Sequence, residues 1–499
     1  MAVSTIRPGG ALPVHIQELK QQMAELQVQL GTGRKATTYG GIGSGRSLAL
    51  ELRGQIARIE SYMTTITLVD LRLNVMDGAL SGMQDVVGTL HGAWLIAPYE
   101  TGSDGRTQIQ HTAEAGLSQL VQLLNSEVNG RYLFAGRDSE TRPVASDRAI
   151  LEGEGARAGL RQVVSERAAA DLGSDGLGRL AVPAAVGSAA SVAEDAAGHP
   201  FGFKLAGVTS SLTGTSVTGP AGAPATIDVV FSATLPVAGE EIAIQVALPD
   251  GTSREIRLVA TTAVPPGAGG FTIGADENTT AANFETALRT EIGRVAAIEL
   301  RAASAVQAAN EFFDFDAATP PQRVAGPPFD SATSVVDATA ADTVFWYRSD
   351  LATPARESAL ARVDEGRTIG YGARADEAAL RNAVKQVALI AVSRFDASLG
   401  TDQERYEALK ARGLPALSGG AGAAAVSDVA TELAHRHIAI NAARDRHRET
   451  LAFAEGTLDA TEGVDLEETG VRFLRLQTQL QASFETTAIL ARLTLVNFL

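Results

Sequence analysis

The sequence contains no cysteine in its 499 residues. This absence excludes disulfide bonds, thiolate metal sites and cysteine nucleophiles. It does not fix the compartment, but it suits a protein that is exported unfolded and must not cross-link on the way. The string His-Glu-x-x-His is also missing, which excludes the helix of a zinc protease. Nothing in the composition predicts a metal or a cofactor.

Basic residues are scarce relative to acidic ones: 42 Lys and Arg face 58 Asp and Glu, giving a net charge of −16. A surface that binds phosphates needs clustered Lys and Arg, so we expect no nucleic-acid partner. No stretch approaches the roughly 18 continuous apolar residues of a membrane span. Residues 1–14, MAVSTIRPGGALPV, lack the apolar segment of a signal peptide. We expect no membrane insertion, and a chain that is cytoplasmic or leaves by a route that cleaves nothing.

Two long amphipathic patterns stand out instead, one toward each end of the chain. Apolar residues recur at alternating three- and four-residue steps from Leu52 to Trp94, and again from Phe473 to Leu499. A helix with such a stripe needs a partner helix to cover it, so each pattern predicts half of an interface. The first helix would be roughly 65 Å long, more than a small domain is wide.

A shorter helix precedes the first pattern and is ended by Gly31 and Gly33. Together the three helices carry the residues that we expect at the subunit and assembly interface. These are Ile16, Leu19, Met23, Leu26, Leu30, Leu52, Ile56, Ile59, Met63, Phe473, Leu476, Leu480, Phe484, Leu495, Phe498 and Leu499.

The middle of the chain changes to a period of two. Ile227, Val229 and Phe231 alternate with polar residues, and residues 242–248 continue the pattern up to a Pro-Asp-Gly turn. One amphipathic helix is predicted near 284–295, and the Ser/Thr/Gly-rich stretch 209–225 is expected to be an exposed loop. This part reads as a small α+β domain inserted between helical arms.

The fold class expected is therefore a mainly α coiled-coil rod, formed by the N- and C-terminal helices, with an inserted small α+β domain. The length of 499 residues calls for several domains. We divide the chain into an N-terminal helical region (1–136), a connector with some local helix (137–200), the inserted domain (201–330), a second connector (331–372) and a C-terminal helical region (373–499).

Three features look like chemistry and have plainer explanations. Residues 40–47, GGIGSGRS, resemble a P-loop with Arg in place of Lys, but no strand precedes them, so a hinge between two helices is the better interpretation. His435 and His437 point to different sides of a helix, as surface histidines do. The acids Asp459, Glu462, Asp465, Glu467 and Glu468 lack calcium-loop spacing and suit the N-terminus of the last helix.

Several strings resemble the bacterial flagellin and hook-associated protein 3 (hook–filament junction protein) family. The most specific is NGRYLFAG at 129–136; others are LGTGRK at 30–35, LQTQLQASF at 476–484 and the ending LTLVNFL. The resemblance covers the N-terminus to about residue 136 and about 371 to 499, leaving out the middle, where the family varies. A Ser-Asp-Asp-type turn common in the family is replaced here by TYGGIG at 38–43.

The resemblance implies a structural protein, not an enzyme, without cofactor. It implies export through the flagellum's own type III channel without a cleaved signal, and self-assembly outside the cell with hook-associated proteins and flagellin. The two termini would pair as a coiled coil in the core of the tube, with the inserted domain facing outward. We also expect a cytosolic export chaperone on the C-terminal helix, whose apolar stripe is otherwise an aggregation hazard.

Within the family, the ending VNFL and the segment GYGARADE at 370–377 look more like the junction protein than the major filament flagellin, which is the close alternative. A coiled-coil adhesin or phage-fibre-like protein is a more distant alternative. It would associate in parallel through one seam, without pairing of the two ends. An enzyme carried by the insert is a third class, and the missing His-Glu-x-x-His between 201 and 316 argues against its metalloprotease version.

Overall fold

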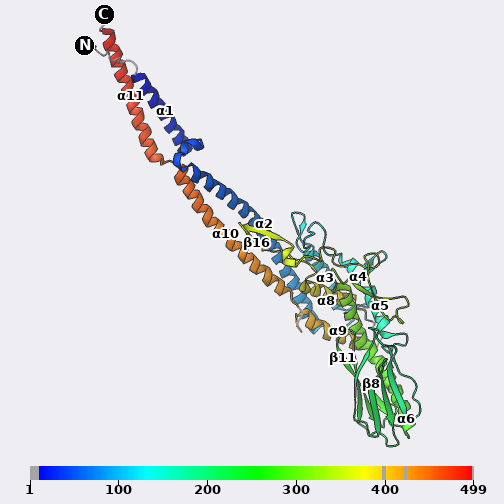
Figure 1. Ribbon diagram of the computed structural model, residues 1–499. Coiled ribbons are helices and arrows are strands. Elements are labelled where there is room, and N and C mark those ends of the chain that lie inside the picture. The colour runs from blue at the N-terminus through cyan, green and yellow to red at the C-terminus, as the bar shows by residue number, and fades with distance from the viewer. Residues whose placement is uncertain (1–10, 396–399, 421–423, 497–499) are drawn as a thin grey trace. The chain divides into compact units, whose positions relative to one another are not determined.

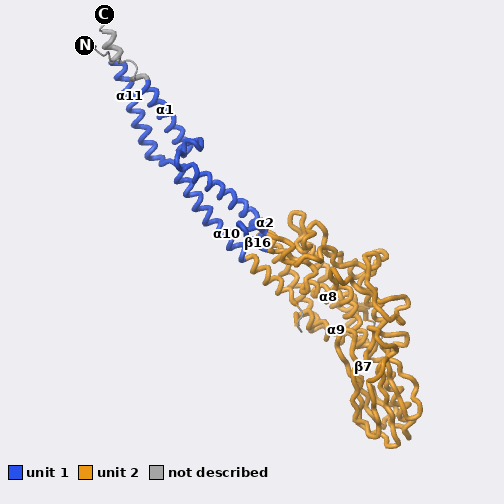
Figure 2. Tube along the Cα trace, viewed as in Figure 1, with its two compact units in different colours: residues 1–69, 361–369, 438–499 blue, residues 70–360, 370–437 orange. Residues whose placement is uncertain are grey.

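The computed structural model describes residues 11–395, 400–420 and 424–496; side chains are described from residue 14 to 489 within these ranges. The chain folds into two compact units (Figure 2). The terminal-helix unit comprises residues 1–69, 361–369 and 438–499, and the sheet-containing unit comprises 70–360 and 370–437. Among the described residues, no helix combines the length and the hydropathy needed to cross a bilayer.

The terminal-helix unit is built from segments at both ends of the chain. Its elements are α1 (Ala11–Thr32), the short 3-10 helix η1 (Tyr39–Gly45), the first part of α2 (Arg46–Ile96), most of α10 (Val426–Glu462) and α11 (Leu466–Val496). The strands β15 (Leu360–Asp364) and β16 (Arg367–Gly370) add a hairpin. In Figure 1, α1 and α11 lie side by side and run in opposite directions. Long helices at both ends of the chain were predicted, and the structure confirms them.

The stripe predicted for α2 is the buried face of that helix. Of its members, Leu52, Ile59, Ile66, Val69, Leu73, Met76, Leu80, Met83, Leu90 and Trp94 are at most 6% exposed. The helix covers 46–96 without a break because no proline interrupts it before Pro98. The glycine-rich residues after α1 connect two helices, as expected, and no strand precedes them.

Helices also form much of the sheet-containing unit. Besides the second part of α2 and the start of α10, they are α3 (Gln108–Leu124), α4 (Asp147–Glu152), α5 (Leu160–Leu172), α6 (Glu277–Val295), the π-turn η2 (Ala296–Leu300), α7 (Arg301–Phe313), the short η3 (Ala355–Glu357), α8 (Ala378–Val392) and α9 (Asp402–Leu417). α3 packs on α8, and α5 packs on α7, while α7 and α8 both contact α9. The apolar faces of α3 and α8 are buried in this packing.

Two four-stranded sheets make up the insert. One has the order β12-β11-β10-β7, with strands Gly270–Thr272, Ser253–Thr261, Glu241–Ala247 and Lys204–Ser210. The other has the order β5-β6-β9-β8, with strands Leu180–Ala181, Ala189–Glu194, Thr226–Phe231 and Thr215–Ala221. All neighbours are antiparallel except β11 and β12. Four two-stranded ribbons complete the strands: β1 (Glu127–Val128) with β2 (Arg131–Tyr132), β3 (Gly153–Glu154) with β4 (Arg157–Ala158), β13 (Gln322–Val324) with β14 (Val335–Asp337), and β15 with β16.

The two sheets and α6 share one hydrophobic core. Alternation decides which strand residues enter it: Ile244 pairs with Ile256 and Ile242 with Leu258, and all four are buried. Phe284 of α6 stands edge-on to Phe271 and Phe231, with ring centroids 5.3 and 5.6 Å away. This core also takes in Leu177, Leu180 and Val192, which lie outside the insert predicted at 201–330.

Some expectations for the middle of the chain differ from the structure. β5 and β6 come from residues 180–194, which we expected to be connector, and the exposed loop expected at 209–225 contains β8. β8 is an edge strand with mostly exposed residues, so its composition resembles that of a loop. The division into domains stays a prediction.

Candidate assembly surface

The pair formed by α1 and α11 carries most of the predicted interface residues. Leu19 is 4% exposed, whereas Ile16, Met23, Leu26 and Leu30 are only half-buried. On α11, the half-buried residues are Phe473, Leu476 and Leu480. One helix can cover only one side of its partner, so much of the apolar surface of this pair stays uncovered.

Phe484 is the predicted residue that is most exposed, at 44%. The ammonium of Lys20 lies 5.4 Å from its ring centroid, within the range of a cation–π contact. Because that contact leaves much of the ring bare, Phe484 keeps surface for another partner.

The remaining predicted residues lie elsewhere. On α2, Leu52 and Ile59 are buried, and Ile56 and Met63 are half-buried. Leu495 falls in α11, but its side chain lies outside the described part of the chain. The predictions for Phe498 and Leu499 fall outside the described residues altogether.

A second apolar face of α11 escaped the sequence analysis. Val471 is 67% exposed, Leu474 is 61% exposed and Ile489 is 57% exposed. Val471 and Ile489 are about five helical turns apart and so lie on one line, well away from the Phe473–Leu480 stripe. These residues lie outside the three-four repeat, and their own spacing of 18 residues between Val471 and Ile489 is the signal in the sequence that predicts a second face.

The end of α10 is tied to the segment that follows α1. The ammonium of Lys35 donates to the carbonyl oxygens of Ala460 and Thr461, at 3.0 and 2.8 Å, and the Lys35 N–H donates to Glu462 O at 2.7 Å. The last carbonyls of a helix lack partners within it and attract cations, so Lys35 caps α10. We call these residues, 33–35 with 459–464, the joint.

A buried carboxylate strengthens the joint. Arg53 donates from Nε and Nη2 to the two carboxylate oxygens of Glu462, at 2.9 and 2.6 Å. These hydrogen bonds hold the pKa of the Glu462 carboxyl below its usual value and raise the pKa of Arg53. The Val464 N–H returns a bond to Gly33 O at 3.0 Å. Residues 33–35 and 459–464, which are far apart in the sequence, are thus fixed to each other where α1 ends and α11 begins.

After the joint, α11 begins at a side-chain cap. Asp465 accepts hydrogen bonds from the N–H groups of Glu467 and Glu468, at 2.9 and 3.1 Å. The acids 465–468 therefore sit at the N-terminus of the last helix, as predicted, whereas Asp459 and Glu462 belong to α10.

The histidines of α10 are not all on its surface. His435 is exposed, as expected of a surface histidine, and His437 is half-buried and pairs with Asp70 at 2.6 Å, whereas His447 is only 6% exposed. The ring of His447 stacks on Tyr62 at 5.5 Å, and its Nε2 donates to Val363 O at 2.6 Å. The β15–β16 hairpin covers this position, so a distant segment buries it.

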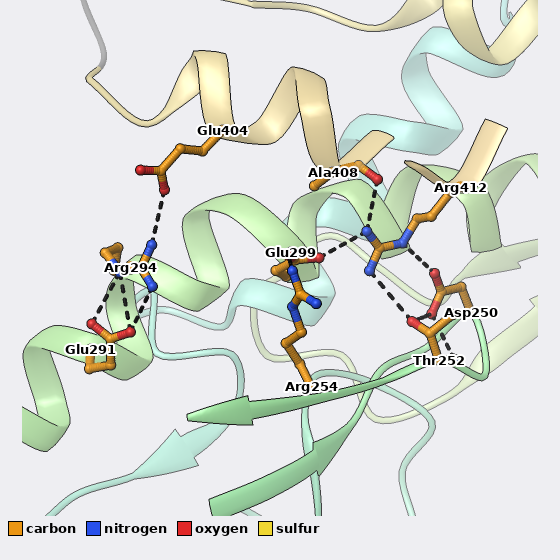
Figure 3. Close-up of polar contacts among 9 residues, drawn as sticks. All are labelled: Asp250, Thr252, Arg254, Glu291, Arg294, Glu299, Glu404, Ala408 and Arg412. Atoms are coloured by element: carbon orange, nitrogen blue, oxygen red, sulfur yellow. Dashed lines mark hydrogen bonds and ion pairs between the residues drawn. The ribbon is translucent and has the colours of Figure 1, made fainter. Parts of the chain in front are cut away.

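A second polar cluster lies in the sheet-containing unit (Figure 3). Arg412 of α9 donates to Asp250 Oδ2 at 2.7 Å and to Glu299 Oε2 at 2.9 Å, and Arg254 pairs with the other oxygen of Glu299. Two cations meet two carboxylates, so the charges balance. We read the cluster as a link between α9 and the β10–β11 turn rather than as a catalytic site.

Metal ligands do not gather in the described part of the chain: no group of three or more His, Asp or Glu side chains there is placed to hold an ion. The residues of interest are instead apolar and lie on helices at the two ends of the sequence. The arrangement suits association with other helices.

Comparison with known proteins agrees with this description. Residues 4–139 match the family model for the bacterial flagellin N-terminal helical region. The match includes α1, α2, α3 and the β1–β2 ribbon. No curated protein matches the chain.

Proposed function

We propose that this chain is the hook–filament junction protein, because the match of residues 4–139 to the bacterial flagellin N-terminal helical region supports a structural subunit of the extracellular flagellum. Flagellins are structural rather than enzymatic and assemble with other axial proteins. The proposal for the junction rests on the ending VNFL and the segment 370–377, both of which look like that branch. Major filament flagellin is the alternative from which it must be distinguished.

The observation that carries an assembly role is the uncovered apolar surface of α1 and α11. Val471, Leu474 and Ile489 are each more than half exposed in the single chain. Exposed apolar residues in such a group mark an interaction surface. We propose that neighbouring subunits cover them, together with those of the sixteen predicted interface residues that the single chain leaves accessible. Leu19, Leu52 and Ile59 are already buried within the chain and would support the surface from behind.

We propose further that the terminal helices wind as a coiled coil in the core of the tube and that the inserted domain, predicted at 201–330, faces outward. The 3.5-residue repeat of α2 and the pairing of α1 with α11 support this arrangement. Cross-pairing of the two chain ends also favours it over an adhesin that associates through one seam.

Export is proposed to use the flagellar type III channel without a cleaved signal. A cytosolic chaperone that masks α11 before export is part of the same proposal. Its basis is the exposed apolar surface of α11, which would otherwise drive aggregation.

The decisive experiment is to place an epitope in the exposed β8 region and to image flagella on cells. Label confined to the distal end of the hook supports the junction protein, and label along the whole filament supports major flagellin instead. Deleting the protein gives a second readout: loss of a junction protein leaves hooks while filament subunits appear in the medium. Label absent from flagella would contradict both.

A further inference from the structure

A cavity of about 610 Å³ lies between α5, α7, the end of α8 and α9. Its size is typical of pockets that hold a small molecule. All of its lining residues belong to the sheet-containing unit, and none of them takes part in the surface proposed for assembly.

The inner wall of the cavity is apolar. Val392, Leu409 and Phe395 are between 2% and 8% exposed, and Ala302 and Ala305 add small side chains from α7. Half-buried Val164 and Leu172 of α5 also line the cavity. Such a wall favours an aliphatic or aromatic body.

Four arginines from four segments also line this cavity: Arg161, Arg301, Arg394 and Arg405. One carboxylate, Glu152, faces them and pairs with Arg161 at 2.7 Å. Such an excess of positive charge is unexpected in a chain with a net charge of −16. It makes the cavity a local site of attraction for an anion.

The four arginines differ in how many partners their guanidinium groups already have. Arg405 pairs with Asp402 at 3.1 Å, and its guanidinium lies 5.3 Å from the Phe395 ring centroid. Within the part of the chain that the structure describes, no hydrogen bond or ion pair reaches the guanidinium of Arg301 or Arg394. Nε of Arg161 is buried, again without a partner among these residues. These donors are available to a ligand.

A neighbouring cavity is also lined by arginines, but it is not a comparable site for an anion. It measures about 830 Å³ and is lined by Arg254, Arg294 and Arg412. Those arginines pair with carboxylates, and four glutamates (Glu255, Glu299, Glu404 and Glu407) line the same cavity. It offers no excess of positive charge.

We propose that the 610 Å³ cavity binds an organic anion with an apolar body, the simplest example being a fatty-acid carboxylate. The carboxylate accepts hydrogen bonds from Arg301 and Arg394, and the hydrocarbon chain lies against Val392 and Leu409. Guanidinium groups suit this head group because they donate in a planar fork. The inference does not depend on the flagellar function.

The test is calorimetric titration of the full-length, unassembled chain with decanoate, decan-1-ol and acetate. Decanoate is expected to bind at least tenfold more tightly than either of the others, because only decanoate has both the head group and the body. Equal affinity for decan-1-ol would show that the arginines do not bind the head group, and would overturn the proposal. Equal affinity for acetate would reduce the cavity to a site for small anions and overturn the proposal.

Amino-acid substitutions test whether decanoate binds in this cavity. The double change Arg301→Gln and Arg394→Gln is expected to weaken decanoate binding at least tenfold and to leave decanol binding unchanged. Ala168→Phe narrows the cavity and should weaken both ligands. Arg436→Gln, on the exposed side of α10, serves as the control. Circular dichroism confirms folding, and undiminished decanoate binding to the double variant would place the ligand elsewhere and refute the site.

Discussion

At the scale of single residues, the joint depends on one carboxylate. Glu462 has a side chain that is 8% exposed and accepts both hydrogen bonds from Arg53. Glu468, a few residues further on, makes a similar pair with Arg472, but its side chain is 61% exposed. Ion pairs in water contribute little, whereas a buried carboxylate with two charged hydrogen bonds contributes more.

Replacing Glu462 by Gln should therefore destabilise the terminal-helix unit by about 1.5 kcal/mol at neutral pH. Because Arg53 lowers the pKa of Glu462, the stabilisation is present above the usual carboxyl pKa and is lost as the pH falls through the lowered one. The rate of amide hydrogen exchange at Lys35 and Val464 measures this loss of stability. The variant should differ less from the parent chain in acid, and Glu468→Gln should change little at any pH.

Substituting alanine for two helical glycines should change the stability in opposite directions. A Cβ at Gly413 would lie 2.4 Å from the Trp94 ring, which is buried, whereas nothing lies within 4 Å of a Cβ at Gly456. Gly413→Ala should therefore destabilise the sheet-containing unit by about 1–3 kcal/mol through overpacking. Gly456→Ala should stabilise α10 by roughly 0.5–1 kcal/mol through helix propensity. Denaturant unfolding measures both, and equal effects would contradict the close packing at Trp94.

At the scale of elements, α11 has two apolar faces, and we expect them to contact different partners. Leu480 is half-buried on the stripe that faces α1, and Leu474 is 61% exposed on the other face. Leu480→Asp should lower both the helix content of the single chain and its incorporation into flagella. Leu474→Asp should leave the helix content unchanged and still block incorporation. Circular dichroism and the amount of the chain in purified flagella separate the two, and normal incorporation of Leu474→Asp would exclude that face from the interface.

The link between α9 and the β10–β11 turn gives a second prediction at this scale. Replacing Arg412 by Met leaves Asp250, whose side chain is 2% exposed, without its cation. A buried charge deprived of its partner costs about 3–5 kcal/mol. Arg257→Met is the control, because that side chain is 53% exposed on β11. Thermal unfolding should separate the two variants clearly; similar transitions would show that the cluster of Figure 3 contributes little.

The elements also differ in how well the sequence predicted them. The stripe of α2 and the alternation in β9 and β10 correspond closely to the buried faces, since periodicity is a local property. β6, with the sequence AASVAE, has little β-propensity and becomes a strand by pairing with β9. His447 lies between two arginines and looks exposed until the distant hairpin covers it. Periodicity likewise says which residues of α11 share a face, but not which face meets α1.

At the scale of the whole molecule, the two units differ in how they are completed. The sheet-containing unit closes a core around Phe231, Phe271 and Phe284, all at most 2% exposed. The terminal-helix unit leaves whole faces of α1 and α11 bare, including the predicted interface residue Phe484. The sheet-containing unit therefore buries its apolar core within a single chain, whereas the terminal-helix unit leaves apolar faces exposed.

The bare faces of α1 and α11 bear on where the proposed assembly can begin. Two free copies that meet in solution can cover only part of each other, whereas the tip of an existing hook presents a ready-made ring of neighbours. Free chains alone should therefore give no rise in light scattering, whereas purified hooks added to them should bind the chain. The same incompleteness that makes the helix pair insufficient by itself confines assembly to a tip that already exists.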